Sequence, residues 1–317
     1  MTYSTATLWI MLLSAFALLI NTGNCSPAPS EPDEQQFTDL TGDWFSQPLP
    51  GMSPERFAPS IFRATLEWFW HGAPFFSPDR EEMYYVKYNV DHTIQIQFTE
   101  QVDGRWTLPR IPSFAVESGE NNPVISPDGQ RIYFISIRSG KQLFTAERTG
   151  NGWTEPVPVV IPIPASMELG WQFSLANNGT LYFGLWDDGD PGQLDLYYSR
   201  FIDGAYTTPE SLGPGINSDS NDFCPFVDPE EDFLIFVSQR PEGFGMSDLY
   251  ITFRNSDETW GELVHPGAPI NTSVSDVWPY IPYSGNVLFF VSTRSGDEGF
   301  NPYWVDAGII DTWRPNH

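Results

Sequence analysis

The sequence is poor in cysteine, histidine and basic residues, and each shortage excludes a class of protein. Only two of its 317 residues are cysteines and four are histidines. Because Cys25 lies in a segment expected to be removed or lipidated, Cys224 has no partner, which excludes a disulfide-based fold and a cysteine-rich metal site. Lysine and arginine number 15 against 41 acidic residues, a net charge of −26. This balance repels phosphate backbones and anionic lipid, so we expect no nucleic-acid partner.

Long amphipathic helical patterns are also absent. Apolar residues instead occur in short clusters rich in Tyr, Phe, Ile and Val, which are bounded by Gly, Pro, Asn and Asp. The 26 glycines and 29 prolines follow no collagen-like period, which suits many short strands joined by tight turns. The composition therefore predicts an all-β protein.

The first residues differ from the rest of the chain. Leu8–Ile20 is an uninterrupted run of apolar and small residues, short for a membrane span and typical of the core of a signal peptide, although no basic residue precedes it. We predict a signal peptide over residues 1–25, a polar Pro-rich linker over residues 26–50, and export to the periplasm or the cell exterior. The less favoured alternative is a lipid anchor on Cys25, because Asn24 fits a lipobox poorly.

A self-comparison of the remaining chain finds five copies of a repeat of about fifty residues, starting at positions 74, 123, 173, 225 and 279. Each copy has a short strand, a turn of Pro-Asp-Gly type, a very apolar strand, a loop often opened by Ser-x-Arg, an alternating third strand and an aromatic fourth element. Four antiparallel strands per copy predict one blade of a β-propeller. Residues 51–317 are therefore predicted to form a single propeller of five four-stranded blades, with six blades as the alternative.

The two ends of the chain are expected to close this ring. The fifth copy ends without a fourth element, whereas the apolar stretch Phe57–Trp70 precedes the first copy and has no other assigned role. An open sheet edge is usually paired or covered. We expect Phe57–Trp70 to supply the missing outer strand.

The repeat also carries a family resemblance. Its pattern, seen in Ser126–Gly129, Ile132–Phe134 and Asp248–Tyr250, resembles the TolB-like, WD-repeat-like propellers with Pro-Asp repeats that occur in many exported bacterial proteins. The resemblance covers about residues 50–310 and implies a propeller with a binding role. It carries over no catalytic residue, because the motif residues of the family are structural. Copies three and five depart from the pattern by lacking the Pro-Asp pair.

Charged residues that recur within the repeat have a structural interpretation. The carboxylates of the turns are expected to bond their own backbone. They are Asp79, Asp128 and Glu230. The arginines of the Ser-x-Arg motif are expected to pair with acids of the turns or of the third strands. They are Arg138, Arg240 and Arg294.

A candidate site lies three residues before the start of each copy. These equivalent positions hold His71, Glu120, Gly170, Asp222 and Asp276. The innermost strands of a propeller line its channel, so we expect these side chains at one mouth of the channel. Three carboxylates and one histidine at this mouth suit a hard cation such as Ca²⁺, or a cationic ligand. The crowded carboxylates need a counter-charge, which either a bound cation or His71, if protonated, would supply. The alternative is that all are solvated residues that cap turns.

Two tryptophans beside this ring of positions suggest a ligand. Trp171 and Trp278 are placed to stack on a sugar or another flat ligand. We therefore predict an exported, monomeric binding module for a protein, small-molecule or glycan partner. The alternative is a carboxylate-dependent glycoside hydrolase, or a related hydrolase, with its site in the channel. The sequence contains no Gly-x-Ser-x-Gly or His-Glu-x-x-His motif that would favour another enzyme class.

Overall fold

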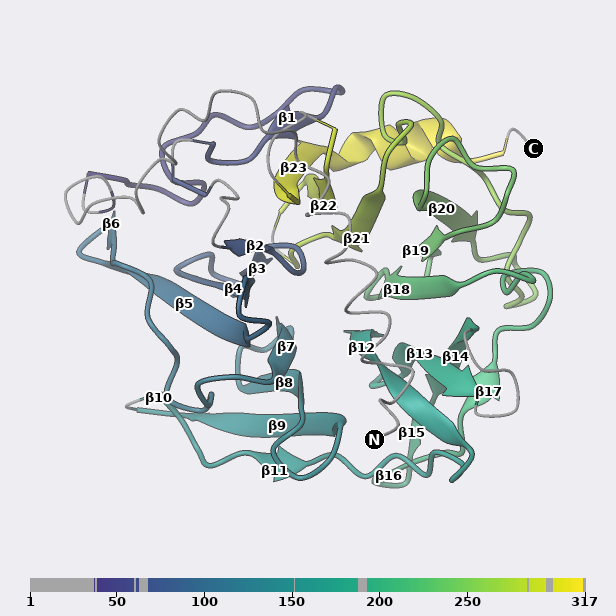
Figure 1. The fold of residues 1–317 in the computed structure, drawn as a ribbon, viewed down its shortest axis with the longest axis horizontal. Helices are drawn as coiled ribbons and strands as arrows, with labels where there is room; N and C mark the ends of the chain where they lie inside the picture. The colour runs from purple at the N-terminus through teal and green to yellow at the C-terminus, as the bar shows by residue number, and fades with distance from the viewer. Residues whose placement is uncertain are drawn as a thin grey trace.

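Five β-sheets radiate from a central axis as the blades of a propeller (Figure 1). The computed structural model describes residues 37, 39–59, 61–62, 68–150, 152–187, 193–283, 285–294 and 299–315. The predicted all-β propeller is confirmed, with five blades rather than six. The predicted signal peptide and Cys25 lie outside the described residues. No helix in the described part of the chain is long and apolar enough to cross a membrane.

The first three blades follow one another along the chain, each with its innermost strand first. Blade 1 comprises β2 (Trp68–Trp70), β3 (Phe75–Phe76), β4 (Glu82–Asn89), β5 (Ile94–Val102) and β6 (Arg105–Trp106). Blade 2 comprises β7 (Glu120–Ile125), β8 (Arg131–Ser136), β9 (Gln142–Thr149), β10 (Gly152–Trp153) and β11 (Val157–Pro158). Blade 3 comprises β12 (Met167–Leu175), β13 (Leu181–Asp187), β14 (Leu194–Ser199) and β17 (Glu210–Ser211), with a small hairpin of β15 (Phe201–Ile202) and β16 (Ala205–Tyr206).

The last two blades differ at their outer edges. Blade 4 has β18 (Asp222–Val227), β19 (Phe233–Ser238) and β20 (Asp248–Phe253), and isolated bridges to Trp260 and Val264 stand where a fourth strand was predicted. Blade 5 has β21 (Asp276–Tyr280), β22 (Val287–Ser292) and β23 (Asn301–Asp306), and a 3-10 helix, η1 (Ala307–Trp313), follows it. The outer strand of blade 5 is β1 (Glu55–Arg56), which comes from the other end of the chain.

Ring closure by an N-terminal strand is confirmed, but the strand is not the predicted one. Glu55 pairs with Trp304 and Arg56 pairs with Tyr303, so closure takes place just before the predicted stretch Phe57–Trp70. The end of that stretch, Trp68–Trp70, forms β2 and pairs with β4 in blade 1. Phe57 still takes part, because its backbone N–H donates to the Pro302 carbonyl at 2.9 Å and its side chain is fully buried.

An aromatic cluster fills the seam between blades 1 and 5, where the chain ends meet. Trp44 contacts Phe76 of blade 1 and Trp304 of blade 5, with ring centroids 5.0 and 5.7 Å apart. Trp44 and Phe45 come from the end of the predicted linker, and both are buried. This part of the chain therefore packs on the propeller instead of serving as a linker.

Each of three innermost strands contains a β-bulge that directs residues into the channel. Pairing shifts register in β7, β18 and β21, and Asn122, Cys224 and Trp278 have φ values of 53°, 50° and 54° at the shift. A bulky residue such as tryptophan rarely adopts positive φ, and such backbone strain concentrates at functional sites. Cys224 is buried, as predicted, and burial raises the pKa of its thiol.

Candidate functional site

Three predicted site residues, Glu120, Asp222 and Asp276, lie at the starts of the innermost strands and are fully buried. Each forms an ion pair with the Ser-x-Arg arginine of its own blade. The pairs are Glu120 with Arg138, Asp222 with Arg240 at 2.9 Å, and Asp276 with Arg294 at 2.7 Å. In each blade the arginine Nε also donates to the motif serine, at 3.2, 2.8 and 3.1 Å. These acid–arginine pairs fasten the second strand of a blade to its first.

The acid–arginine pairs correct two predictions. The arginines bind first-strand acids instead of the acids of the turns or third strands. The acids are also engaged on their second oxygen, which accepts the backbone N–H of Ser218 for Asp222 and of Thr272 for Asp276, at 2.6 and 2.7 Å. Across the described ranges no group of three or more His, Cys, Asp and Glu residues is placed to hold a metal ion. The predicted Ca²⁺ site is therefore not supported, because its carboxylates serve as structural ion-pair partners.

The structural interpretation of the turn carboxylates is confirmed for Asp79 and Asp128. Each Oδ1 accepts a hydrogen bond from the serine two residues earlier, at 2.5 Å in both turns, and from the backbone N–H two residues later. These hydrogen bonds lower the pKa of Asp128. In blade 4 it is Asp228 that accepts the backbone N–H, whereas Glu230 accepts the side-chain amide of Asn177.

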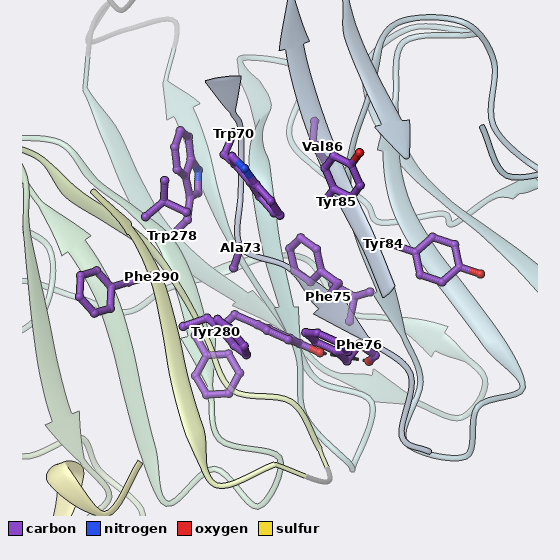
Figure 2. Packing of buried hydrophobic residues seen from close by; sticks show 14 of the residues in the cluster. Trp70, Ala73, Phe75, Phe76, Tyr84, Tyr85, Val86, Trp278, Tyr280 and Phe290 are labelled. Atoms are coloured by element: carbon purple, nitrogen blue, oxygen red, sulfur yellow. Dashed lines mark hydrogen bonds between the residues drawn. The ribbon is translucent and has the colours of Figure 1, made fainter. Parts of the chain in front are cut away.

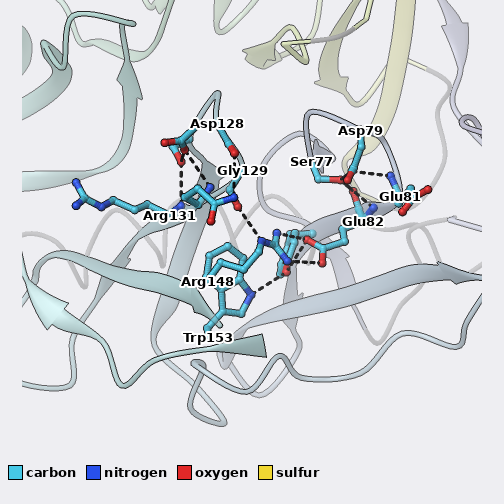
Figure 3. A network of polar contacts seen from close by, with 12 residues as sticks. Ser77, Asp79, Glu81, Glu82, Asp128, Gly129, Arg131, Arg148 and Trp153 are labelled. Carbon is cyan, nitrogen blue, oxygen red and sulfur yellow. Dashed lines mark hydrogen bonds and ion pairs between the residues drawn. The ribbon is translucent and has the colours of Figure 1, made fainter. Parts of the chain in front are cut away.

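A cavity of about 470 Å³ lies among these turns, at the opposite end of blades 1 and 2 from the predicted site. Figure 3 shows the network that crosses it, in which Arg148 donates to both carboxylate oxygens of Glu82 at 2.8 and 2.7 Å. The guanidinium also lies over the Trp153 ring, 4.2 Å from its centre. The charged side chains that line this cavity therefore connect blade 1 to blade 2 or cap the turns.

A pocket of about 110 Å³ lies at the mouth of the channel where the innermost strands begin. It brings together three predicted residues, His71, Trp171 and Trp278, with other aromatic side chains from blades 3, 4 and 5. These are Trp186, Phe223 and Phe300. The polar part of the lining is uncharged. It consists of Gln172, Asn221, Gln239, Ser247 and Ser275. The described lining holds no carboxylate, so the hydrolase alternative has no acid–base pair in it.

His71 enters the pocket as a neutral imidazole. Asn121 accepts the Asn122 N–H with its Oδ1, so its amide nitrogen donates to His71 Nδ1 at 3.1 Å. This assignment leaves the proton on Nε2. Burial lowers the pKa of His71 to about 4. A neutral His71 offers no counter-charge to Glu120, Asp222 and Asp276, which pair with arginines instead.

Trp278 forms the wall between the pocket and the interior of the channel. Its ring lies 5.0 Å from that of His71 and 5.2 Å from that of Phe300. Its Nε1 is buried and has no hydrogen-bond partner in the part of the chain that the structure describes. A buried donor without a partner is costly, and each such group requires an explanation.

The channel is filled below Trp278, so the pocket has a floor. The Phe75 ring lies 4.8 Å from the Tyr280 ring, and Tyr280 donates to the Phe76 carbonyl at 3.5 Å (Figure 2). From blade 5 Tyr283 reaches Leu175 of blade 3 and donates to its carbonyl at 3.3 Å. Only a void of about 30 Å³ remains among these side chains.

Blades 1 and 3, which lack the acid–arginine pair, contribute His71, Trp171 and Trp186 to the pocket. In blade 3, Gly170 stands at the acid position and Trp186 at the arginine position, since Leu169 pairs with Leu185. A Cβ on Gly170 would lie 3.1 Å from the Gly184 carbonyl oxygen, so the two backbones approach closely. Outward of this point the strand pair continues as Met167–Leu169 with Leu185–Asp187, which carries Trp186 to the mouth. Trp171 follows Gly170 on the inner side, where the pairing shifts register between Leu169 and Phe173.

In blade 1, His71 and Tyr88 take the acid and arginine positions, and their rings stack 5.8 Å apart. His71 is thus the blade 1 counterpart of Glu120, Asp222 and Asp276 but makes an aromatic contact instead of an ion pair. Sequence reasoning missed Trp186, although its place at the arginine position of the third copy was a usable signal. Phe223 and Phe300 had no such signal.

Comparisons with known proteins find similarities among solved structures but not among families or curated sequences. No protein-family model matches the chain, and no curated protein matches it. TolB from Acinetobacter baumannii is similar in structure, with 14% identity and a TM-score of 0.43 over 73% of this chain and 53% of that chain. A putative TolB from Agrobacterium tumefaciens has 18% identity and a TM-score of 0.45 over 72% of this chain and 71% of that chain.

An α-L-arabinofuranosidase from Lactobacillus brevis is also similar, with 14% identity and a TM-score of 0.45 over 70% of this chain and 84% of that chain. This chain spans about half the length of the first TolB structure. At these identities the similarities concern the fold alone.

Proposed function

We propose that this protein is an exported, TolB-like propeller that binds a small-molecule ligand in the pocket at its channel mouth. The observation that carries the proposal is the buried indole N–H of Trp278, which lines this pocket and has no partner in the described part of the chain. Binding sites are typically concave and mostly apolar, with a few placed polar groups. The aromatic walls, the uncharged amides and hydroxyls and the strained backbone at Trp278 fit that description.

The repeat resemblance and the apolar run Leu8–Ile20 support the other two parts of the proposal, the TolB-like character and the export. A filled channel also favours a bound ligand over passage through the ring, because Tyr280 and Tyr283 occupy the channel beneath the pocket.

The test is a thermal-shift screen of small molecules from several classes, namely neutral sugars, amines, carboxylates and aromatic heterocycles. A ligand at about one hundred times its dissociation constant stabilises the folded state by about 2.7 kcal/mol. We expect at least one class to raise the melting temperature of the wild-type protein and not that of Trp171→Ala. If every class acts equally on both proteins, the pocket is not a binding site.

A further inference from the structure

The lining of the channel-mouth pocket indicates a chemical class of ligand. Resting on the function proposed above, we infer that the pocket binds one uncharged carbohydrate ring, the terminal residue of a neutral glycan. Four properties of the pocket carry this inference: its charge, its indoles, its free polar groups and its size.

The described lining is uncharged at neutral pH. It contains no lysine, arginine, aspartate or glutamate, and burial keeps the imidazole of His71 neutral. Against this described lining, a charged ligand would lose its hydration without gaining a counter-charge, which is expensive in a buried site. A carboxylate, phosphate or ammonium group is therefore a poor match for this lining.

Indole rings form much of the wall. Trp171, Trp186 and Trp278 come from two blades and line the same pocket. A sugar ring has a face of C–H groups that packs on a flat aromatic surface, and the large area of tryptophan makes it effective in this role. A lysine of blade 2 helps to fix the position of Trp171. The Lys141 ammonium lies 5.0 Å from the centre of the Trp171 ring and pairs with Glu168 of blade 3 at 2.5 Å.

The polar groups of the residues that line the pocket include both donors and acceptors. Asn221, Gln239 and Ser247 are occupied with one another, at 2.9 and 3.1 Å. Trp278 Nε1 and the side chains of Gln172 and Ser275, in contrast, have no hydrogen bond within the described residues. A hydroxyl group both donates and accepts, so adjacent hydroxyls of one sugar ring can satisfy an indole N–H, an amide and a serine together.

The size of the pocket limits the ligand to one ring. A volume of about 110 Å³ is smaller than that of a cavity that holds a single benzene, roughly 150 Å³, so the pocket takes up one sugar ring at most, and only in part. The floor of Phe75 and Tyr280 prevents deeper entry along the channel. The rest of a longer glycan must therefore remain outside the mouth.

The test is a titration of the full-length protein with methyl glycosides of neutral hexoses and pentoses and with neutral disaccharides, followed by tryptophan fluorescence and calorimetry. Glucuronate and glucosamine serve as charged counterparts. We expect at least one neutral glycoside to bind, at least tenfold more tightly than its charged counterpart. Trp171→Ala is expected to weaken binding more than tenfold, and Trp278→Phe, which keeps a ring but removes the N–H, by roughly two- to tenfold.

If Trp278→Phe fails to fold, Gln172→Ala takes its place as the variant that removes a polar group from the pocket. It changes a side chain that is only half buried. Val160→Ala, at a residue that is 80% exposed in the segment between β11 and β12, is the control and should bind like the wild type. Equal or tighter binding of the charged counterparts overturns the inference. If a non-sugar ligand from the thermal-shift screen binds the wild type but not Trp171→Ala, the carbohydrate inference fails. The proposed function then still stands. If no small molecule binds, both fail.

Discussion

Acidification should destabilise this protein in a way that depends on His71. The imidazole is 7% exposed and contacts the rings of Tyr88 and Trp278. Among the described residues its one side-chain hydrogen bond comes from Asn121. Burial lowers the pKa of His71 from 6.5 to about 4. Between these values the unfolded chain has taken up a proton that the folded protein has not, so the free energy of unfolding falls as the pH falls.

The magnitude follows from the two pKa values. One pKa unit corresponds to about 1.4 kcal/mol, so the fall from 6.5 to about 4 is worth about 3 kcal/mol. This contribution is fully present above about pH 6.5 and is lost by about pH 4. His71→Gln removes the titrating group while keeping an acceptor for Asn121, so the variant should not show this part of the pH dependence.

The assay is urea unfolding of the wild type and of His71→Gln at pH 7, 5.5 and 4. Many carboxylates also titrate in this range, but they are common to both proteins and cancel in the difference. We expect the stability difference between the two proteins to change by about 3 kcal/mol in favour of the variant between pH 7 and pH 4. His92→Gln, at an exposed histidine, is the control. Parallel pH profiles for wild type and His71→Gln would refute the reasoning.

Three further predictions concern the blades, the ring closure and export. Arg240→Ala leaves the fully buried Asp222 without its partner. The variant should therefore have a free energy of unfolding, measured in urea, that is lower by about 3–5 kcal/mol. A loss below about 1 kcal/mol would show that the pair is dispensable. Phe57→Ala, in the seam, should cost about 3–5 kcal/mol by the same assay, and a loss no larger than that of the exposed Val160→Ala would contradict the described closure. For export, N-terminal sequencing of secreted material should find cleavage shortly after Leu8–Ile20, and a mature chain beginning at Met1 would disprove it.

The repeat made the fold predictable because each copy carries its own local signals. Turn carboxylates such as Asp128, apolar second strands and a constant spacing all indicate blades, and equivalent positions in equivalent blades must lie around one axis. The closing strand was predicted a few residues too late in the chain. The apolar residues of Phe57–Trp70 that suggested it either pack in the interior, as Phe57 does, or belong to β2. The strand that pairs with β23, Glu55–Arg56, is polar, and pattern alone does not mark it.

Of the six residues predicted at the channel mouth, three line the pocket and three form ion pairs instead. Spacing placed His71, Trp171 and Trp278 at one mouth, and the structure brings them together. Spacing does not give the direction of a side chain, however. Asp222 turns toward Arg240, which is eighteen residues along the chain and lies two residues beyond the end of β19. The sequence offered no way to choose Asp222 as the partner of this arginine over the acids of the turns or third strands.

The absence of the acid–arginine pair from blade 3 gives the protein a region that tolerates redesign. At the mouth, blades 2, 4 and 5 depend on buried charges such as Asp276, and any substitution there must replace an ion pair. Trp171 and Trp186 take part in no such ion pair, and both are only partly buried. A library that varies these two positions and Gln172 should therefore yield folded proteins with altered ligand preference, while the same diversity at the equivalent positions of blade 4 should yield mostly unfolded ones.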